Sequence, residues 1–155
     1  MENKNLKLEL TQVFDSSLDK VWDAWTNPEA LREWKSPEGI ETGGAQVDLK
    51  IGGEYKIKMH ADKDPFSNNG RELNETLTGK YKEIIPKEKL AYSWLWEGMP
   101  KETHDTTVTI LFKKLATDRT EVTLIHEGFP DLKMKNEHNF GWESTLRKLK
   151  SFLNK

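Results

Sequence analysis

The residues with the most distinctive chemistry in this chain are aromatic. It holds six tryptophans although only 35% of its 155 residues are hydrophobic. Flat rings with one polar edge can line a cavity for an apolar ligand, stacking on it and offering N–H or O–H donors. Core packing is the simpler explanation for any single ring, so the prediction rests on the whole set. Its members are Trp22, Trp25, Tyr55, Tyr92, Trp94, Trp96 and Trp142.

A second candidate chemistry is acid–base catalysis at His126. This residue has the same parity as Val122 and Leu124, which puts its imidazole on the inward side of a predicted strand. There it could donate to a ligand carbonyl or act as a general base near neutral pH. The alternative, which is the commoner situation, is a buried histidine hydrogen-bonded to backbone or to a polar neighbour.

Carboxylates are the other candidates for acid–base work. Glu75 and Glu83 share the parity of Leu77 and Tyr81, so a carboxylate is expected on the inward face of the same sheet. A β-bulge in this strand would reverse the orientation of the residues beyond it. No catalytic residue is assigned from this pattern.

Spacing excludes several other kinds of site. The four histidines lie in different predicted elements without an HxH or HExxH pattern, so no metal site is expected. Gly79-Lys80 lacks the upstream glycine of a phosphate-binding loop, and Gly52-Gly53 is interpreted as a hairpin turn. The sequence contains no GxSxG motif and no cysteine nucleophile. No cofactor is predicted.

Charge and composition limit the partners. The 24 Lys and Arg and 26 Asp and Glu give a net charge of -2, so no global positive field attracts nucleic acid or an anionic membrane. The sequence shows neither an apolar run of about 18 residues nor a signal-peptide pattern. Because it also lacks cysteine for disulfides, we interpret residues 1–155 as one soluble, cytoplasmic domain.

Apolar residues that alternate with polar ones predict seven strands. The first begins near Leu6. The second is predicted at residues 47–51, because residues 36–44 are turn formers with little periodicity. The polar segment 61–72 is expected to form a mobile loop. The other five strands are centred on Tyr55–Met59, Leu73–Ile85, Leu90–Trp96, Val108–Phe112 and Val122–His126.

Helical periodicity appears in two places. After the cap-forming Asp15-Ser16-Ser17, apolar residues recur at helical spacing up to Trp34, and Pro28 splits this segment into two short helices. From Met134 to Leu153 the apolar residues recur every three or four positions, which predicts one long helix. These helices are the available covers for the inner face of the sheet, so the class is α+β: a curved seven-stranded antiparallel sheet enclosing a cavity.

Six segments occur in a familiar order: VFDSSLDKVWDAWTNPEALREW, IGGEY, GKYKEIIPKEKLAYSWLWEG, TTVTILF, TLIHEGFPD and GWESTLRKLKSFL. From about Leu6 to Leu153 the chain resembles the heat-shock protein 90 ATPase activator homologue-like family of the START-like (SRPBCC) superfamily. The resemblance implies a helix-grip, or Bet v-like, fold in which the long helix lies across the sheet. Superfamily members bind hydrophobic ligands, assist chaperones, or catalyse cyclisation and dehydration, so fold alone does not choose among these functions.

We rank three functions. The first is non-catalytic binding of a small hydrophobic or aromatic molecule between the sheet and the last helix, by a monomer or homodimer. The second is a chaperone ATPase cofactor in a stress response, and the third is a cyclase- or dehydratase-like enzyme. The residues predicted to line the cavity come from the first short helix, the inner face of the sheet and the long helix: Trp22, Trp25, Tyr55, Ile57, Met59, Tyr81, Tyr92, Trp94, Trp96, Ile110, Leu124, His126, Trp142 and Leu146.

Overall fold

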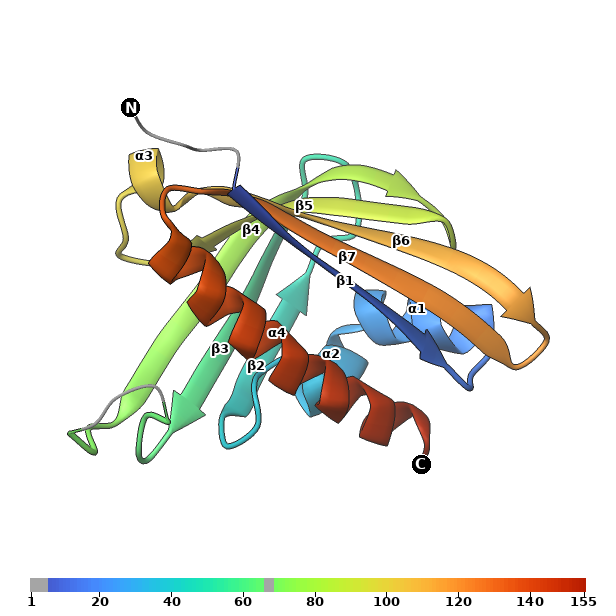
Figure 1. Cartoon of the computed structure of the whole chain (residues 1–155), viewed down its shortest axis with the longest axis horizontal. Coiled ribbons are helices and arrows are strands. Elements are labelled where there is room, and N and C mark those ends of the chain that lie inside the picture. The colour runs from blue at the N-terminus through green and yellow to red at the C-terminus, as the bar shows by residue number, and fades with distance from the viewer. Residues whose placement is uncertain (1–5, 66–68) are drawn as a thin grey trace.

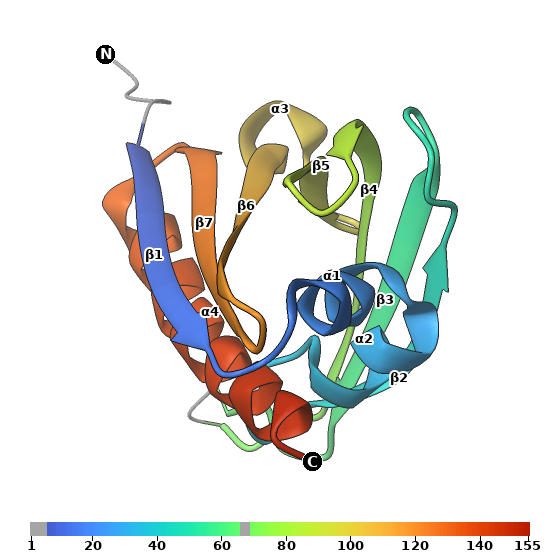
Figure 2. The same cartoon turned by 90° about the vertical axis from the view of Figure 1, so that its right-hand side faces the viewer.

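Seven antiparallel strands form one curved sheet, and a long C-terminal helix crosses its concave side (Figures 1 and 2). The computed structural model describes residues 6–65 and 69–155, apart from the side chains of residues 102 and 103. In chain order the elements are β1 (Leu6–Phe14), α1 (Leu18–Thr26), α2 (Pro28–Trp34), β2 (Glu41–Val47), β3 (Glu54–Ala61), β4 (Leu73–Ile85), β5 (Lys89–Trp96), α3 (Lys101–His104), β6 (Thr106–Ala116), β7 (Arg119–Phe129) and α4 (Leu132–Leu153).

The strand order is β1-β7-β6-β5-β4-β3-β2, so the first strand lies beside the last and β2 forms the far edge. Helices α1 and α2 lie inside the curve of the sheet together with α4 (Figure 2). The predicted helix-grip architecture, with seven strands, two short helices and one long helix, is confirmed. Within the described residues, no helix is both long and apolar enough to cross a membrane.

Local sequence signals set the helix boundaries. The Ser17 hydroxyl caps α1 by accepting a hydrogen bond, 3.2 Å long, from the backbone N–H three residues on. The Asn27 side chain caps α2, whose first residue is Pro28, where the missing N–H costs nothing. The Asp131 carboxylate caps α4 in the same way, accepting from the backbone N–H of Met134 at 2.8 Å. The predicted break at Pro28 is therefore correct.

Alternation along the strands buries one face of the sheet. Tyr55, Ile57 and Met59 of β3 are at most 5% exposed, and the lysines between them are exposed. Strand β7 shows the same period from Thr120 to His126. Because side chains alternate with a period of two, one strand register places all of the inward residues in the core together.

The second strand lies earlier than predicted. Residues 48–53 form the turn between β2 and β3, with Gly52 at a φ of 83°, and Leu49 and Ile51 are 41% and 69% exposed. The prediction of a strand at 47–51 was wrong, because the glycines that looked like turn formers occupy an edge strand. The register of β2 also shifts between Thr42 and Gly44, and bulges and glycines are tolerated at such edges.

Two further points concern segments between the strands. The short helix α3 between β5 and β6 was not predicted from the sequence. The predicted loop at 61–72 falls between β3 and β4, but residues 66–68 lie outside the described residues. On either side of them, the backbone N–H of Asp64 donates to the carbonyl of Arg71 at 2.7 Å.

A β-bulge in β4 decides which way its carboxylates point. The register with β5 shifts between Tyr81 and Glu83. Beyond this shift Glu83 faces outward, where it pairs with Lys89 at 2.9 Å, whereas Glu75 keeps the inward orientation. The two glutamates therefore do not share a face, because the extra residue reverses the alternation.

We predict that Gly79→Ala destabilises the protein by about 1–3 kcal/mol, the usual cost of overpacking. A Cβ at Gly79 would overlap the Ser93 carbonyl oxygen and approach a ring carbon of Tyr55 to 2.6 Å. The Tyr55 hydroxyl donates to that same carbonyl at 2.6 Å, so the ring is held over the glycine. Urea unfolding measures the effect. Gly44→Ala is the control, since its Cβ would meet no atom within 4 Å; equal losses in both variants would contradict this packing.

Candidate functional site

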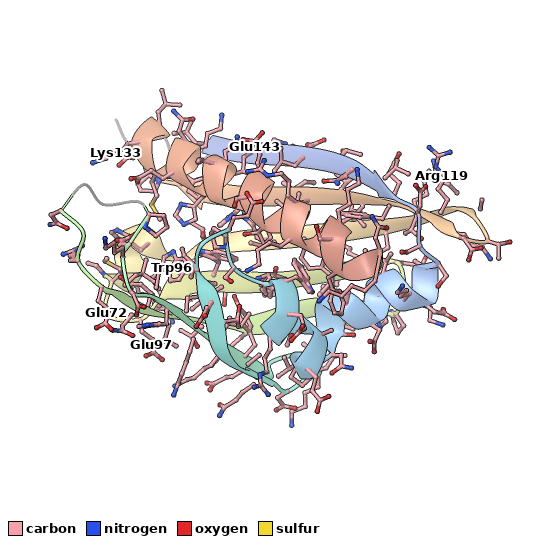
Figure 3. The ribbon with its side chains drawn as sticks, turned by 90° about the horizontal axis from the view of Figure 1, so that it is seen from below. Glu72, Trp96, Glu97, Arg119, Lys133 and Glu143 are labelled. Carbon is pink, nitrogen blue, oxygen red and sulfur yellow. The ribbon has the colours of Figure 1, made fainter. Side chains whose placement is uncertain are left out.

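A pocket of about 310 Å³ lies between the concave face of the sheet and α4. Trp96, labelled in Figure 3, belongs to its wall. This volume is at the lower end of the range for small-molecule sites. The lining comes from the end of α2 and the segment after it, from β3, β4, β5 and the residues following β5, and from α4: Lys35, Pro37, Ile40, Met59, Leu73, Glu75, Trp94, Trp96, Met99, Glu137, His138, Gly141, Trp142 and Thr145.

The structure divides the predicted cavity residues into three groups. Four of them line this pocket: Met59, Trp94, Trp96 and Trp142. Five surround an adjoining gap of only about 10 Å³: Trp25, Tyr55, Ile57, Tyr81 and Tyr92. The other five line neither space: Trp22, Ile110, Leu124, His126 and Leu146. The interior is thus filled toward α1 and α2 and open toward the first half of α4.

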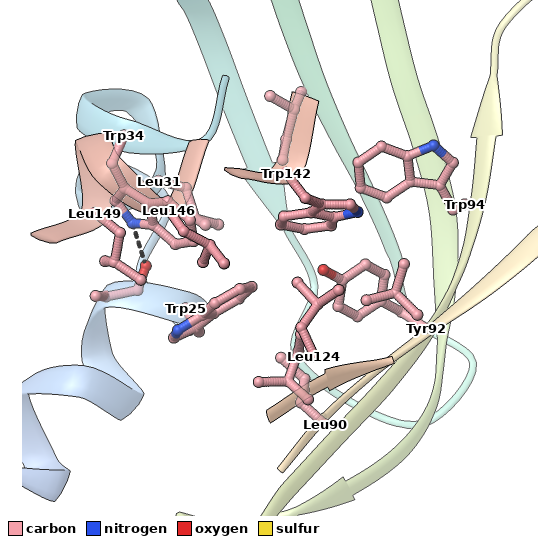
Figure 4. Close-up of a cluster of buried hydrophobic side chains, with 14 of the residues drawn as sticks. Trp25, Leu31, Trp34, Leu90, Tyr92, Trp94, Leu124, Trp142, Leu146 and Leu149 are labelled. Carbon is pink, nitrogen blue, oxygen red and sulfur yellow. Dashed lines mark hydrogen bonds between the residues drawn. The ribbon is translucent and has the colours of Figure 1, made fainter. Parts of the chain in front are cut away.

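Rings from separate elements interlock where α4 crosses the sheet (Figure 4). The Trp142 ring lies 6.1 Å from that of Trp25 on α1 and 5.2 Å from that of Trp94 on β5, measured between ring centres. Trp25 in turn meets Trp34 edge-on at 4.6 Å, and the Trp34 indole donates to the Ala24 carbonyl at 2.9 Å, the dashed line in Figure 4. Trp142 therefore forms the boundary between the packed core and the open pocket.

His126 is fully buried, and both of its ring nitrogens are hydrogen-bonded. The Trp142 indole donates to Nδ1 at 3.0 Å, and Nε2 lies 2.7 Å from the Thr106 hydroxyl. Because an indole N–H only donates, the neutral ring must carry its proton on Nε2. Burial lowers the pKa of His126, and His138 and Lys35 nearby lower it further. This is the hydrogen-bonded histidine of the alternative interpretation, with no nitrogen left to act as a base.

His138 repeats this arrangement in the wall of the pocket. Its Nδ1 donates to the Met134 carbonyl at 2.8 Å, and its Nε2 accepts from the Trp96 indole at 3.2 Å. Burial is the main cause that lowers the pKa of His138. His138 was not among the residues predicted to line the cavity. Its spacing from Trp142, one helical turn away, was the available signal.

Lys35, the C-cap residue that follows α2, was not among the predicted site residues. It is 3% exposed, and its Nζ lies 4.9, 5.0 and 5.6 Å from the ring centres of Trp94, Trp142 and Tyr92. Among the described residues, no carboxylate pairs with this amine and no acceptor bonds to it. Burial lowers the pKa of Lys35 from 10.5 to about 7. Aromatic faces attract a cation, but they do not replace a counter-ion.

The segment after α2 holds Lys35 in this position. The Ser36 hydroxyl accepts a hydrogen bond from Lys148 Nζ of α4 at 3.0 Å. Two residues further on, the Glu38 carboxylate accepts from Arg147 at 2.9 Å. This bond is the main cause that lowers the pKa of Glu38, and a hydrogen bond from Ser144 and the charge of Lys148 on the same helix lower it further. Helix α4 is therefore joined to the chain at two points directly after Lys35.

Three buried donors of the interior have no hydrogen-bond partner among the described residues: the Tyr92 hydroxyl and the indole N–H groups of Trp94 and Trp25. Buried polar groups are nearly always bonded, and leaving one unpaired costs about 1–3 kcal/mol. Tyr92 and Trp94 also carry two of the rings that face the lysine amine. This region of the interior therefore holds hydrogen-bond donors without a partner among the described residues.

A cluster of possible metal ligands lies elsewhere, near the end of β3. Ligand atoms of His60, Asp62 and Glu72 are within 4.8 Å of one another. Both ring nitrogens of His60 are already engaged, with Asn74 at 3.0 Å and Asp62 at 3.1 Å. These two bonds raise the pKa of His60, which favours a charged ion pair over metal ligation. The group is outside the pocket.

Comparisons with known proteins agree with this fold. The family model described as Activator of Hsp90 ATPase homolog 1-like protein matches residues 15–154. Protein CV1439 from Chromobacterium violaceum superposes with a TM-score of 0.77 at 25% identity, over 96% of this chain and 97% of that one. Protein NE0264 from Nitrosomonas europaea gives 0.74 at 22% identity, over 98% and 96%. A Silicibacter pomeroyi protein that bears the family's name gives 0.74 at 21%, over 96% and 98%. No curated protein matches the chain.

We predict that Lys35→Met stabilises the protein, by an amount that depends on pH. The pKa of Lys35 is about 7 in the folded protein against 10.5 ordinarily. Between these values the unfolded chain keeps a proton that the folded chain has lost, so the stability of the wild type rises with pH. The stability advantage of the variant should shrink by roughly 2 kcal/mol from pH 7 to pH 9.

Urea unfolding at the two pH values measures this difference. Lys58→Met, which removes an exposed lysine from β3, is the matched control and should show no such change. A gap between Lys35→Met and the wild type that stays constant with pH would show that the amine does not lose its proton on folding.

Proposed function

The chain belongs to the Activator of Hsp90 ATPase homolog 1-like family, and we propose that it binds a small apolar, ring-bearing molecule in the pocket beneath α4 without transforming it. The observation that carries this proposal is the open volume of about 310 Å³ walled by Trp94, Trp96 and Trp142. The adjoining gap of about 10 Å³ is too small for a guest molecule, whereas this pocket offers both room and aromatic surface.

The wall suits a flat guest. Indole rings offer large apolar faces, and stacked or edge-on ring pairs contribute about 0.5–1.5 kcal/mol beyond the burial of their area. Met59 and Met99 add flexible thioethers to the same wall, and methionine adapts to guests of different outline. The pocket therefore favours a class of ring compounds over one tightly specified shape.

Binding is favoured over catalysis by the state of His126. The enzymatic hypothesis needs this residue as a base, but its two nitrogens bond to Trp142 and Thr106, and it does not line the pocket. His138 does line the pocket, yet its nitrogens are also engaged, by Met134 and Trp96. Both imidazoles thereby support the aromatic wall.

The neutral dye N-phenyl-1-naphthylamine tests the proposal. We expect one dye per chain and quenching of tryptophan fluorescence. Gly141→Phe should weaken binding by about tenfold or more, equivalent to about 1.4 kcal/mol, because the new ring occupies the pocket that Gly141 lines. A Cβ there meets Pro37 at 3.7 Å, an ordinary contact, so the backbone tolerates the change.

Asn136→Phe provides the control, because it adds the same ring to an exposed position of the same helix. It should leave the affinity for the dye unchanged. Unaltered binding in Gly141→Phe would place the dye elsewhere, and a wild-type protein that binds no dye would end the proposal.

We propose chaperone assistance as the second function, on two observations. The family description names an activator of a chaperone ATPase, and α4 presents Leu132 and Phe140, which are 59% and 54% exposed. Exposed apolar side chains of this kind often mark contacts with protein partners. If they do so here, the chain should raise the ATPase rate of a purified Hsp90 chaperone, and Leu132→Ser with Phe140→Ser should abolish the increase. No stimulation by the wild type would exclude this function.

A further inference from the structure

The Lys35 amine lies where a molecule in the pocket would meet it. The residue lines both the large pocket and the small gap beside it. None of the described carboxylates pairs with its Nζ. Burying an ammonium without a counter-ion is costly, whereas methionine would fill the same space without that cost. A lysine at this position is explained if a bound molecule supplies the opposite charge.

The protein groups around Lys35 do not supply this negative charge. His126 Nδ1 and His138 Nε2 already accept hydrogen bonds from indole N–H groups. The Tyr92 hydroxyl and the Trp94 N–H are buried without a partner. The Lys35 ammonium and the Trp94 N–H can only donate, and the Tyr92 hydroxyl can donate as well. Their chemical complement is a group with several acceptor sites.

We infer that the pocket takes an apolar, ring-bearing carboxylic acid, whose carboxylate pairs with the Lys35 ammonium while its ring lies against Trp94, Trp96 and Trp142. This inference rests on the proposed binding function and names its ligand class. A carboxylate offers about four acceptor sites and forms strong charge-assisted bonds with an ammonium. One lysine balances one carboxylate, whereas a phosphate, with a charge of about -1.5 to -2, would leave charge unpaired.

Two glutamates in the pocket wall favour one orientation of such a ligand. Glu75 on β4 is half-buried, and Glu137 on α4 is exposed. A carboxylate placed beside either of them would meet a like charge, which is unfavourable. The ligand's charged end is therefore expected at Lys35, which is buried, and its apolar end toward the glutamates, where water screens the charges.

The pairing makes binding depend on pH in a defined direction. With the pKa of Lys35 near 7 in the empty pocket, binding above pH 7 requires the amine to take up a proton. Affinity for the acid should then fall by up to about tenfold per pH unit. The histidines and tyrosines around the pocket stay neutral in this range, because burial lowers the pKa of the former and raises that of the latter: His126, His138, Tyr55, Tyr81 and Tyr92.

The test compares 2-naphthoic acid with its neutral analogue 2-naphthamide by calorimetry at pH 7, 8 and 9. The wild type should bind the acid about tenfold or more tightly than the amide at pH 7, as expected for a hydrogen bond between charged groups. This preference should decline with pH, while the affinity for the amide stays constant. Lys35→Met should keep its affinity for the amide and lose the preference, whereas Lys58→Met should behave as the wild type.

Four outcomes distinguish failure of the inference from failure of the proposed binding function. Equal affinity of the wild type for acid and amide, or a preference that survives in Lys35→Met, overturns the carboxylate assignment and leaves pocket binding intact. Failure of the wild type to bind the acid, the amide and N-phenyl-1-naphthylamine overturns both. The pH profile of the wild type needs no variant, so a preference for the acid that does not change from pH 7 to pH 9 also overturns the inference.

Discussion

The structure depends on one junction, the point where Trp142 of α4 meets the sheet. Its indole N–H bonds to His126 on β7, and its ring packs between Trp25 of α1 and Trp94 of β5. A single helix cannot fill the whole concave side of a seven-stranded sheet. On the side of Trp25 the helices α1 and α2 complete the packing, and on the other side no helix of the described residues does so. The pocket is a consequence of where this junction falls.

The junction also fixes the chemistry of the interior. An indole can donate but not accept, so each Trp–His pair forces its imidazole into one tautomer and removes it from proton transfer. His126 and His138 are both bound in this way, to Trp142 and Trp96. Burial disfavours their charged forms as well. Lys35, by contrast, lines the pocket as a buried amine with no hydrogen-bond partner among the described residues.

The sequence predicted those features that a two- or three-to-four-residue period controls. Inward faces such as Tyr55 to Met59, and the long final helix, follow directly from it. The position of strand β2 and the orientation of Glu83 were not predicted correctly. An edge strand tolerates glycine, and a bulge reverses the inward–outward alternation of side chains without a signal in the composition. Lys35 was not predicted for another reason. The rings around it belong to β5 and α4, more than 50 positions away, and no local sequence pattern encodes the contact of Lys35 with these elements.

The choice of lysine at this junction has a physical rationale of its own. Arginine remains protonated under all ordinary conditions, so an arginine would impose a full unpaired charge on the empty pocket. A lysine whose pKa is lowered to about 7 by burial can release its proton when the pocket is empty and recover it when an anion arrives. The same side chain then destabilises the empty protein less than a permanent cation would. An unpaired group that costs stability is commonly retained where function requires it, and this one lies in the wall of the pocket.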